Sequence, residues 1–336
     1  MMWTFAKIKS FIPDFVKQGS KRLILRVISV SYLSPKNLAI KFETEDSAAW
    51  PAIFIGTIHG LLYFDGTLAK KLLEGSIYGI TRHETRWYVF QKIETDFGIT
   101  GRLLSFCFKS NVIEKIRIEI DNLDPEVHQI DFVHDILHLT DTANNRILRY
   151  QLLNNRLTKL DPLYPAGRLN KGHESSNYVH LNSIYNLDGL SYVVFHNHTN
   201  KTGTNSQVAV LDEDGNLVKI QDTDFGCAHN FVIVDGQVII CDSQSRAAYF
   251  GDQIILQCAE FTRGVSVTNN NIIIGGSHIV DKVKRGDPSL VGKIYLIDRI
   301  THQVKDVMRL PGIGNIYEIR AIVDDDLGIS FLVVEK

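Results

Sequence analysis

Short apolar, β-branched runs separated by turn residues fill the chain from roughly residue 25 onward, and almost nothing recurs at a helical period. Typical runs are AIFIGTI, WYVFQKI, SYVVFHN, QVIICD and KIYLID. Runs of Val, Ile, Tyr and Phe of this length, bounded by Gly, Asp and Asn, predict β-strands. Many short, evenly spaced strands are typical of a sandwich, a barrel or a propeller. The sequence therefore predicts an all-β fold.

Internal repetition distinguishes among these folds. A unit of strand, tight turn, strand, polar loop, strand, turn and strand recurs over residues 77–120, 128–160, 180–220, 229–257 and 262–308. Residues 52–73 match strands two to four of the last unit, and residues 317–334 supply two more strands. A blade that combines early and late strands closes the ring. We predict a single β-propeller of four-stranded blades, with six blades, or seven if residues 26–45 form their own.

This repeated pattern of strands and turns resembles that of the six-bladed β-propellers. Strictosidine-synthase-like, SMP-30/gluconolactonase-like, NHL-repeat and peptidyl-amidating-lyase proteins share this architecture. The resemblance covers most of the chain from about residue 50 to 336. The sequence carries no signature specific to one of these groups. The resemblance therefore implies the fold, and the function has to be argued from the site.

Three consecutive predicted blades place a histidine at the start of their first strand: His128, His180 and His229. In a propeller these starts surround the mouth of the central channel. Neutral imidazoles that converge at about 2.0–2.1 Å bind zinc or another borderline divalent ion and leave a position open. The pattern predicts a divalent transition metal (zinc, iron or manganese) that polarises a carbonyl or activates a water.

Other reactive side chains are expected on the same face. Arg263 and Glu318 are predicted to orient or polarise the substrate. Tyr178 is the predicted proton donor or base, with Tyr185 and Tyr317 as alternatives. Further predicted substrate-binding residues come from strand starts and from the loops after second strands: His59, Asp141, Asn144, His196, His198, Asp242, His278 and Arg320.

These residues predict a metal-dependent lyase, hydrolase or oxygenase that acts on a small polar substrate at the channel mouth. The amidating lyases, which the chain resembles in architecture, have an axial three-histidine metal site, and the resemblance implies only such an axial metal here. A second hypothesis is a non-catalytic propeller that binds a glycan, peptide or protein on this face. A third is a structural metal closed by a fourth ligand: His196, His198 or Glu318.

Composition narrows the partners. The net charge of −2 and the pI of about 6.6 argue against a general nucleic-acid binder. Four cysteines without CxxC spacing are typical of reduced thiols in a cytoplasmic protein. Residues 1–24 are expected to form an amphipathic arm or helix ahead of a propeller domain over 25–336. Aromatic and basic side chains within residues 1–22 suit a membrane surface or another subunit, and the oligomeric state is open.

Overall fold

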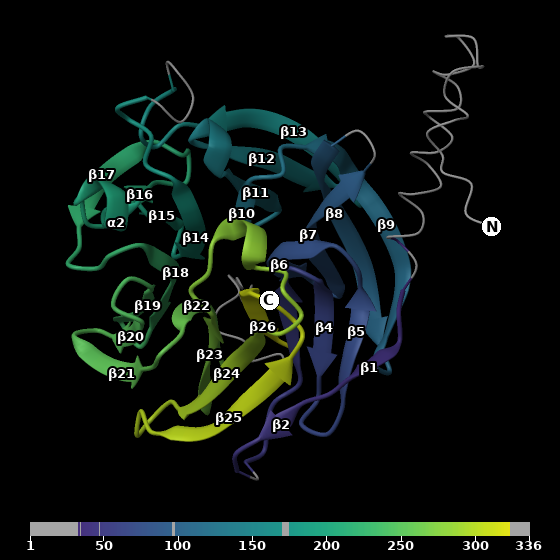
Figure 1. Cartoon of the computed structure of the whole chain (residues 1–336). Helices are drawn as coiled ribbons and strands as arrows, with labels where there is room; N and C mark the ends of the chain where they lie inside the picture. The colour runs from purple at the N-terminus through teal and green to yellow at the C-terminus, as the bar shows by residue number, and fades with distance from the viewer. Residues whose placement is uncertain (1–32, 34, 47, 96–97, 170–174, 323–336) are drawn as a thin grey trace, which may run out of the picture.

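The computed structural model describes residues 33, 35–46, 48–95, 98–169 and 175–322. In this part of the chain, six antiparallel sheets surround a central axis as blades (Figure 1). The predicted six-bladed propeller is confirmed. The predicted arm over residues 1–24 lies outside the described residues, as does the last predicted strand, after Ile322.

Four blades consist of four consecutive strands each. The first two are β6 (Ser76–His83), β7 (Arg86–Thr95), β8 (Gly98–Lys109) and β9 (Val112–Leu123), and then β10 (Val127–Val133), β11 (Ile136–Asp141), β12 (Arg146–Leu153) and β13 (Arg156–Leu163). The next two are β14 (Leu181–Leu187), β15 (Leu190–Phe195), β16 (Gln207–Leu211) and β17 (Leu217–Asp222), and then β18 (Ala228–Val234), β19 (Gln237–Asp242), β20 (Ala247–Phe250) and β21 (Gln253–Gln257).

Two five-stranded blades close the ring with strands from both ends of the chain. One has the order β26 (Ile316–Ala321), β3 (Ile53–Thr57), β4 (Gly60–Phe64), β5 (Ala69–Leu73) and β1 (Leu38–Ile40). The other has the order β22 (Phe261–Val267), β23 (Asn271–Ser277), β24 (Val291–Asp298), β25 (Val304–Pro311) and β2 (Glu43–Thr44). Because β1 and β2 extend two different blades, the alternative of a seventh blade from residues 26–45 is not realised.

The core lies between adjacent blades and is built by strands with both faces covered. Every residue of β3 (IFIGT) is buried, whereas every residue of the outer strand β17 (LVKIQD) is exposed. The inner strands approach closely at the axis: a Cβ on Gly79 of β6 would lie 2.8 Å from the backbone nitrogen of Ile130 in β10. A strand buried on both faces requires a nearly continuous apolar run, which explains why the repeats were readable from the sequence.

Each inner strand carries a register shift just after it begins. The shifts lie at Ile77/Gly79, Val127/Ile130, Leu181/Ser183, His229/Phe231, Thr262/Val265 and Ile316/Glu318. Such a bulge inserts one extra residue and re-aims the side chains beside it. The inserted residues therefore leave the alternation of the sheet at the same level in all six blades.

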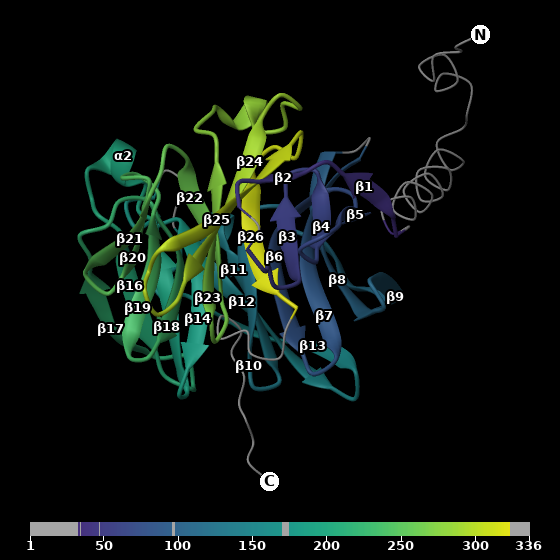
Figure 2. The same cartoon turned by 90° about the horizontal axis from the view of Figure 1, so that it is seen from below.

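Three loops between strands contain short helical turns: α2 (Thr199–Thr202), η2 (Thr142–Asn144) and η4 (Lys282–Lys284). The side view shows α2 at one end of the propeller, beyond the ends of the strands (Figure 2). Over the described residues, we find no helix of the length and apolar character needed to span a bilayer.

Candidate functional site

A pocket of about 680 Å³ lies at the channel mouth. Its walls come from the starts of the inner strands and from the loops that follow second strands, as predicted. Six histidines line it: His128, His180, His196, His198, His229 and His278. The volume is in the range of pockets that enclose small molecules.

Five of these imidazoles, supplied by three consecutive blades, form a continuous cluster. The ring centroid of His180 lies 4.8 Å from that of His128, 4.8 Å from that of His196 and 4.2 Å from that of His198. The rings of His196 and His229 are 5.0 Å apart. The strand-start histidines are thus neighbours in space although they are distant in sequence.

The hydrogen bonds of His229 determine which ring nitrogen carries its proton. Nδ1 lies 2.9 Å from the carbonyl oxygen of Cys227 and 2.9 Å from Oγ of Ser243. The Ser243 hydroxyl donates to the carbonyl oxygen of Thr262 at 2.6 Å, so it accepts from His229. Nδ1 therefore carries the proton, and Nε2 of the neutral ring keeps a free lone pair.

The neighbouring His196 has the opposite tautomer. Its Nδ1 accepts a hydrogen bond of 3.1 Å from the backbone N–H of His198. In the neutral ring Nε2 then carries the proton and is a donor. Two adjacent imidazoles therefore supply one acceptor and one donor, which is a pair suited to a polar ligand.

Tyr178 lies beside the cluster. Its hydroxyl is 3.0 Å from Nδ1 of His180, and its ring lies 6.1 Å from that of His198 at an interplanar angle of 29°. Burial raises the pKa of Tyr178, so the phenol is protonated at neutral pH.

Burial keeps four of these imidazoles uncharged. It lowers the pKa of His128 to about 4. It also lowers the pKa values of His180, His196 and His229 well below the usual value; neighbouring histidines add to the effect and, for His229, so does Arg263. Neutral imidazole is the form that binds metals and accepts protons or hydrogen bonds.

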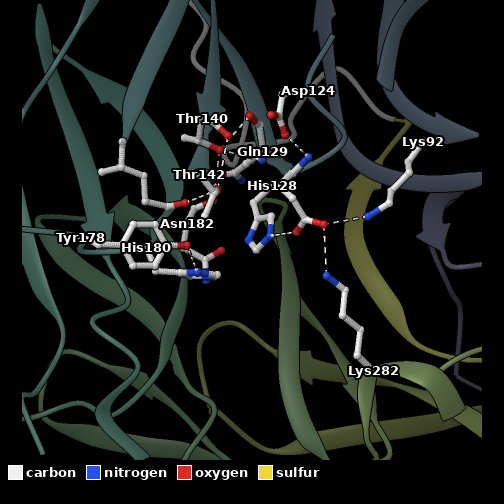
Figure 3. Close-up of polar contacts among 12 residues, drawn as sticks. Lys92, Asp124, His128, Gln129, Thr140, Thr142, Tyr178, His180, Asn182 and Lys282 are labelled. Atoms are coloured by element: carbon white, nitrogen blue, oxygen red, sulfur yellow. Dashed lines mark hydrogen bonds and ion pairs between the residues drawn. The ribbon is translucent and has the colours of Figure 1, made fainter. Parts of the chain in front are cut away.

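An acidic group, Glu126, anchors one side of the pocket. Its Oε1 lies 3.0 Å from Nζ of Lys92 and 3.1 Å from Nζ of Lys282, and its Oε2 lies 3.9 Å from Nε2 of His128. Figure 3 labels these three partners. The contact with His128 and the two ammonium groups lower the pKa of Glu126. Nδ1 of His128 is buried and finds no hydrogen-bond partner in the described part of the chain.

Arg263 projects into the pocket against two stacked tyrosines. The rings of Tyr78 and Tyr317 are 4.1 Å apart at an interplanar angle of 12°. The guanidinium carbon lies 4.9 Å from the ring centroid of Tyr317 and 5.6 Å from that of Tyr78. All three residues belong to the bulged starts of inner strands, which explains their common direction.

The pocket brings together eight of the residues predicted from the sequence. They are His128, His180, His229, Arg263, Tyr178, His196, His198 and His278. Six other predicted site residues do not line it: Glu318, Arg320, Asp141, Asn144, Asp242 and His59.

Two of these six lie deeper in the channel. Glu318 accepts a hydrogen bond of 3.0 Å from Nε2 of Gln129 and lies 3.1 Å from NH1 of Arg320. Arg320 also donates to the carbonyl oxygens of Ile80 and Val265. Burial raises the pKa of Glu318 to about 7, although Arg320 opposes the shift. Both side chains are thus used in connecting inner strands.

The other four are held in local contacts. Asp141 accepts from Asn144 at 2.8 Å and from Arg146 at 2.6 Å. Asp242 accepts from the backbone N–H groups of Gly226 and Ser245, and Nε2 of His59 lies 2.9 Å from the carbonyl oxygen of Gly286. These contacts are typical of turn and loop stabilisation.

Several lining residues were not predicted from the sequence, among them Tyr78, Glu126 and Lys282. A signal existed for the first, because IYGI at residues 77–80 repeats IYEI at residues 316–319 at the same blade position. Glu126 stands only two residues ahead of His128. Lys282 had no signal, since its position depends on the path of the loop between β23 and β24.

The predicted metal depends on converging donors. The described residues contain no group of three or more His, Cys, Asp or Glu side chains arranged to hold a metal ion. Metal binding at His128, His180 and His229 stays a prediction.

Comparison with known proteins supports the fold alone. No protein-family profile matches the sequence, and no curated protein is significantly similar to it. A chain of the nidogen/laminin complex superposes with a TM-score of 0.59 at 12% identity, over 82% of this chain and 100% of that chain. A candidate 6-phosphogluconolactonase from Bacteroides fragilis superposes with a TM-score of 0.50 at 9% identity, over 83% of this chain and 99% of that chain. The chain is thus a six-bladed β-propeller, and some propellers of similar shape are named as enzymes.

Proposed function

We propose that this chain is an enzyme that acts on a small polar substrate in the axial pocket through its histidine cluster. The observation that carries the proposal is the cluster itself: five imidazoles in contact, four of them with lowered pKa values, facing one pocket of about 680 Å³. A cluster that only satisfied backbone groups would need no free ring nitrogens. His229 keeps a free Nε2 lone pair, and Nδ1 of His128 is buried without a partner among the described residues.

The residues have complementary parts in this proposal. The unprotonated nitrogen of His229 accepts a proton or binds a divalent ion, and His196 donates a hydrogen bond to the substrate. Tyr178 stays protonated beside His180 and acts as a proton donor. Lyase, hydrolase and oxygenase chemistry are all compatible with this set. A pocket of about 680 Å³ favours a small molecule over a glycan, peptide or protein partner.

The test is turnover of simple substrates by matched histidine variants. Wild-type protein, His229→Gln and His138→Gln are assayed with nitrophenyl acetate, nitrophenyl phosphate and gluconolactone. His138 is a matched control because it is buried but lies outside the pocket. We expect His229→Gln to lose roughly 100-fold or more in turnover of whichever substrate reacts, and His138→Gln to retain it. Equal turnover by wild type and His229→Gln would contradict the proposal.

The predicted divalent metal is a separate part of the proposal. Bound by His128, His180 and His229, such an ion would act as a Lewis acid toward the substrate. Protein purified without an affinity tag or chelator is expected to hold about one equivalent of zinc, iron or manganese. His128→Ala, His180→Ala and His229→Ala are each expected to lose it, and His138→Ala to keep it. Absence of metal from the wild type, with none taken up when the three ions are offered, would remove the metal from the proposal.

A further inference from the structure

We infer that the substrate of this pocket carries an anionic group, a carboxylate or a phosphate, and that Arg263 binds it. The inference rests on the proposed function and names its substrate class. It starts from the surroundings of one side chain. Arg263 is only 7% exposed and lines the pocket.

The neighbours of Arg263 orient its charge without neutralising it. Tyr317 and Tyr78 place their ring centroids 4.9 and 5.6 Å from the guanidinium carbon. Aromatic faces attract a cation and fix its plane, but they carry no net charge. The planar guanidinium is therefore held in one direction while its N–H groups remain available.

No protein carboxylate of the described residues contacts this charge, and Glu318 attracts it only from beyond 4.0 Å. In residues 35–322, excepting the short undescribed gaps, no carboxylate lies within 4.0 Å of the Arg263 guanidinium, and the guanidinium donates no hydrogen bond. Glu318 is occupied by Arg320 and Gln129. Glu126 is occupied by Lys92 and Lys282.

A buried cation that no carboxylate contacts costs free energy, and an arginine cannot avoid that cost by losing its proton. An anion that enters the pocket removes this cost. Guanidinium matches carboxylate and phosphate oxygens through two parallel hydrogen bonds. The arrangement is therefore that of a preformed binding site for an oxyanion.

The other charged residues that line the pocket are also mainly positive. The cations Lys201, Lys282 and Arg285 join Arg263, whereas the acidic lining residues are Glu126 and Asp281. The buried imidazoles are neutral and add no charge of their own. A positive pocket with low-dielectric walls attracts anionic ligands.

The experiment titrates inorganic phosphate and malonate, separately, into the full-length protein at constant ionic strength maintained with chloride. Calorimetry measures the affinity, and the unfolding temperature gives a second readout. We expect saturable binding of at least one anion with a rise in unfolding temperature. Stronger binding of phosphate indicates a phosphorylated substrate, and stronger binding of malonate indicates a carboxylic acid.

Arginine variants assign the binding to Arg263. Arg263→Met is expected to weaken it roughly 10- to 100-fold, as for the loss of charge-assisted hydrogen bonds. Arg263→Lys, which keeps the charge but not the planar fork, is expected to bind with intermediate affinity. Arg309→Met is the control, because Arg309 pairs with Glu45 away from the pocket. This variant is expected to bind the anions with wild-type affinity.

Two results would overturn the inference: no saturable response of the wild type to either anion, or unchanged affinity in Arg263→Met. The first requires no variant, so a poorly folded variant does not obscure it. Histidine-dependent turnover without anion binding would refute this inference and leave the proposed function standing. Anion binding without histidine-dependent turnover would refute the proposed function and leave Arg263 as an anion-binding residue.

Discussion

The central channel contains two buried polar regions that differ in how completely their groups are paired. In the interior, Glu318 accepts hydrogen bonds from Gln129 and Asn230 and pairs with Arg320. At the mouth, Arg263 has no carboxylate partner among the described residues, and Nδ1 of His128 is likewise buried without a hydrogen bond. Both regions lie on inner strands of the propeller.

The difference separates structural from functional polarity. A buried polar group that is fully paired holds neighbouring strands in register, and its removal leaves a partner unsatisfied. A buried polar group without a partner weakens the free protein and is explained by a ligand that completes it. Two arginines of similar burial illustrate the contrast. Arg320 is 2% exposed and pairs with Glu318, whereas Arg263 is 7% exposed and contacts no carboxylate of the described residues.

The largest effect on stability is expected from replacing Arg320 in the interior of the channel. Arg320→Met leaves Glu318 buried without its cation and frees the carbonyls of Ile80 and Val265. We expect it to lower the free energy of unfolding by about 3–5 kcal/mol. Arg263→Met, which removes an unpaired charge, is expected to change it by less than about 1 kcal/mol or to raise it. Urea denaturation of both variants measures the difference, and equal losses would refute the distinction between the two regions.

A second prediction concerns His138, a histidine that is buried but lies outside the pocket. Burial, with Arg149 adding to it, lowers the pKa of His138 to about 3. The unfolded chain therefore binds a proton that the folded chain excludes, and His138 costs stability as the pH falls below about 6.5. Between pH 7 and pH 5 this amounts to about 2 kcal/mol.

Replacing this histidine tests the assignment. His138→Gln is expected to lose about 2 kcal/mol less stability than wild type on acidification from pH 7 to pH 5. Chemical denaturation at the two pH values measures it. Identical pH dependence of the two proteins would mean that His138 is not excluded from protonation in the folded state.

The smallest effect on stability is expected from replacing Lys282, an exposed residue at the channel mouth. Lys282 is 68% exposed in its side chain and pairs with Glu126, which Lys92 also contacts. Because exposed ion pairs contribute little, Lys282→Ala is expected to change the free energy of unfolding by less than about 1 kcal/mol. A loss of several kcal/mol in thermal or urea unfolding would place Lys282 with the structural pairs of the interior.

The fold was predictable because its determinants are local and repeated. Apolar runs such as IFIGT and FVIV mark strands that are buried on both faces, and Asp235-Gly236 marks a hairpin turn in which both residues have positive φ, 52° and 74°. The closure was visible because residues 52–73 repeat the later strands. Blade number depended on where residues 38–44 pair, which the sequence left open and the pairing of β1 and β2 resolves.

The candidate site was predictable only to the level of a shared face. The strand starts placed His128, His180 and His229 together, but they did not separate Arg263 from Arg320 or assign Glu318 to the interior. That separation depends on the bulge at Thr262/Val265 and on side-chain direction, which has no local sequence signal. The contribution of Lys282 depends on a loop path across the pocket and was equally unreadable.

The most direct test of the account is a crystal structure grown with malonate or phosphate at constant ionic strength. We predict electron density for the anion in the axial pocket, in contact with the Arg263 guanidinium and within reach of the histidine cluster, with the Glu318–Arg320 pair unchanged. An Arg263 side chain turned onto a protein carboxylate, with no anion in the pocket, would contradict it.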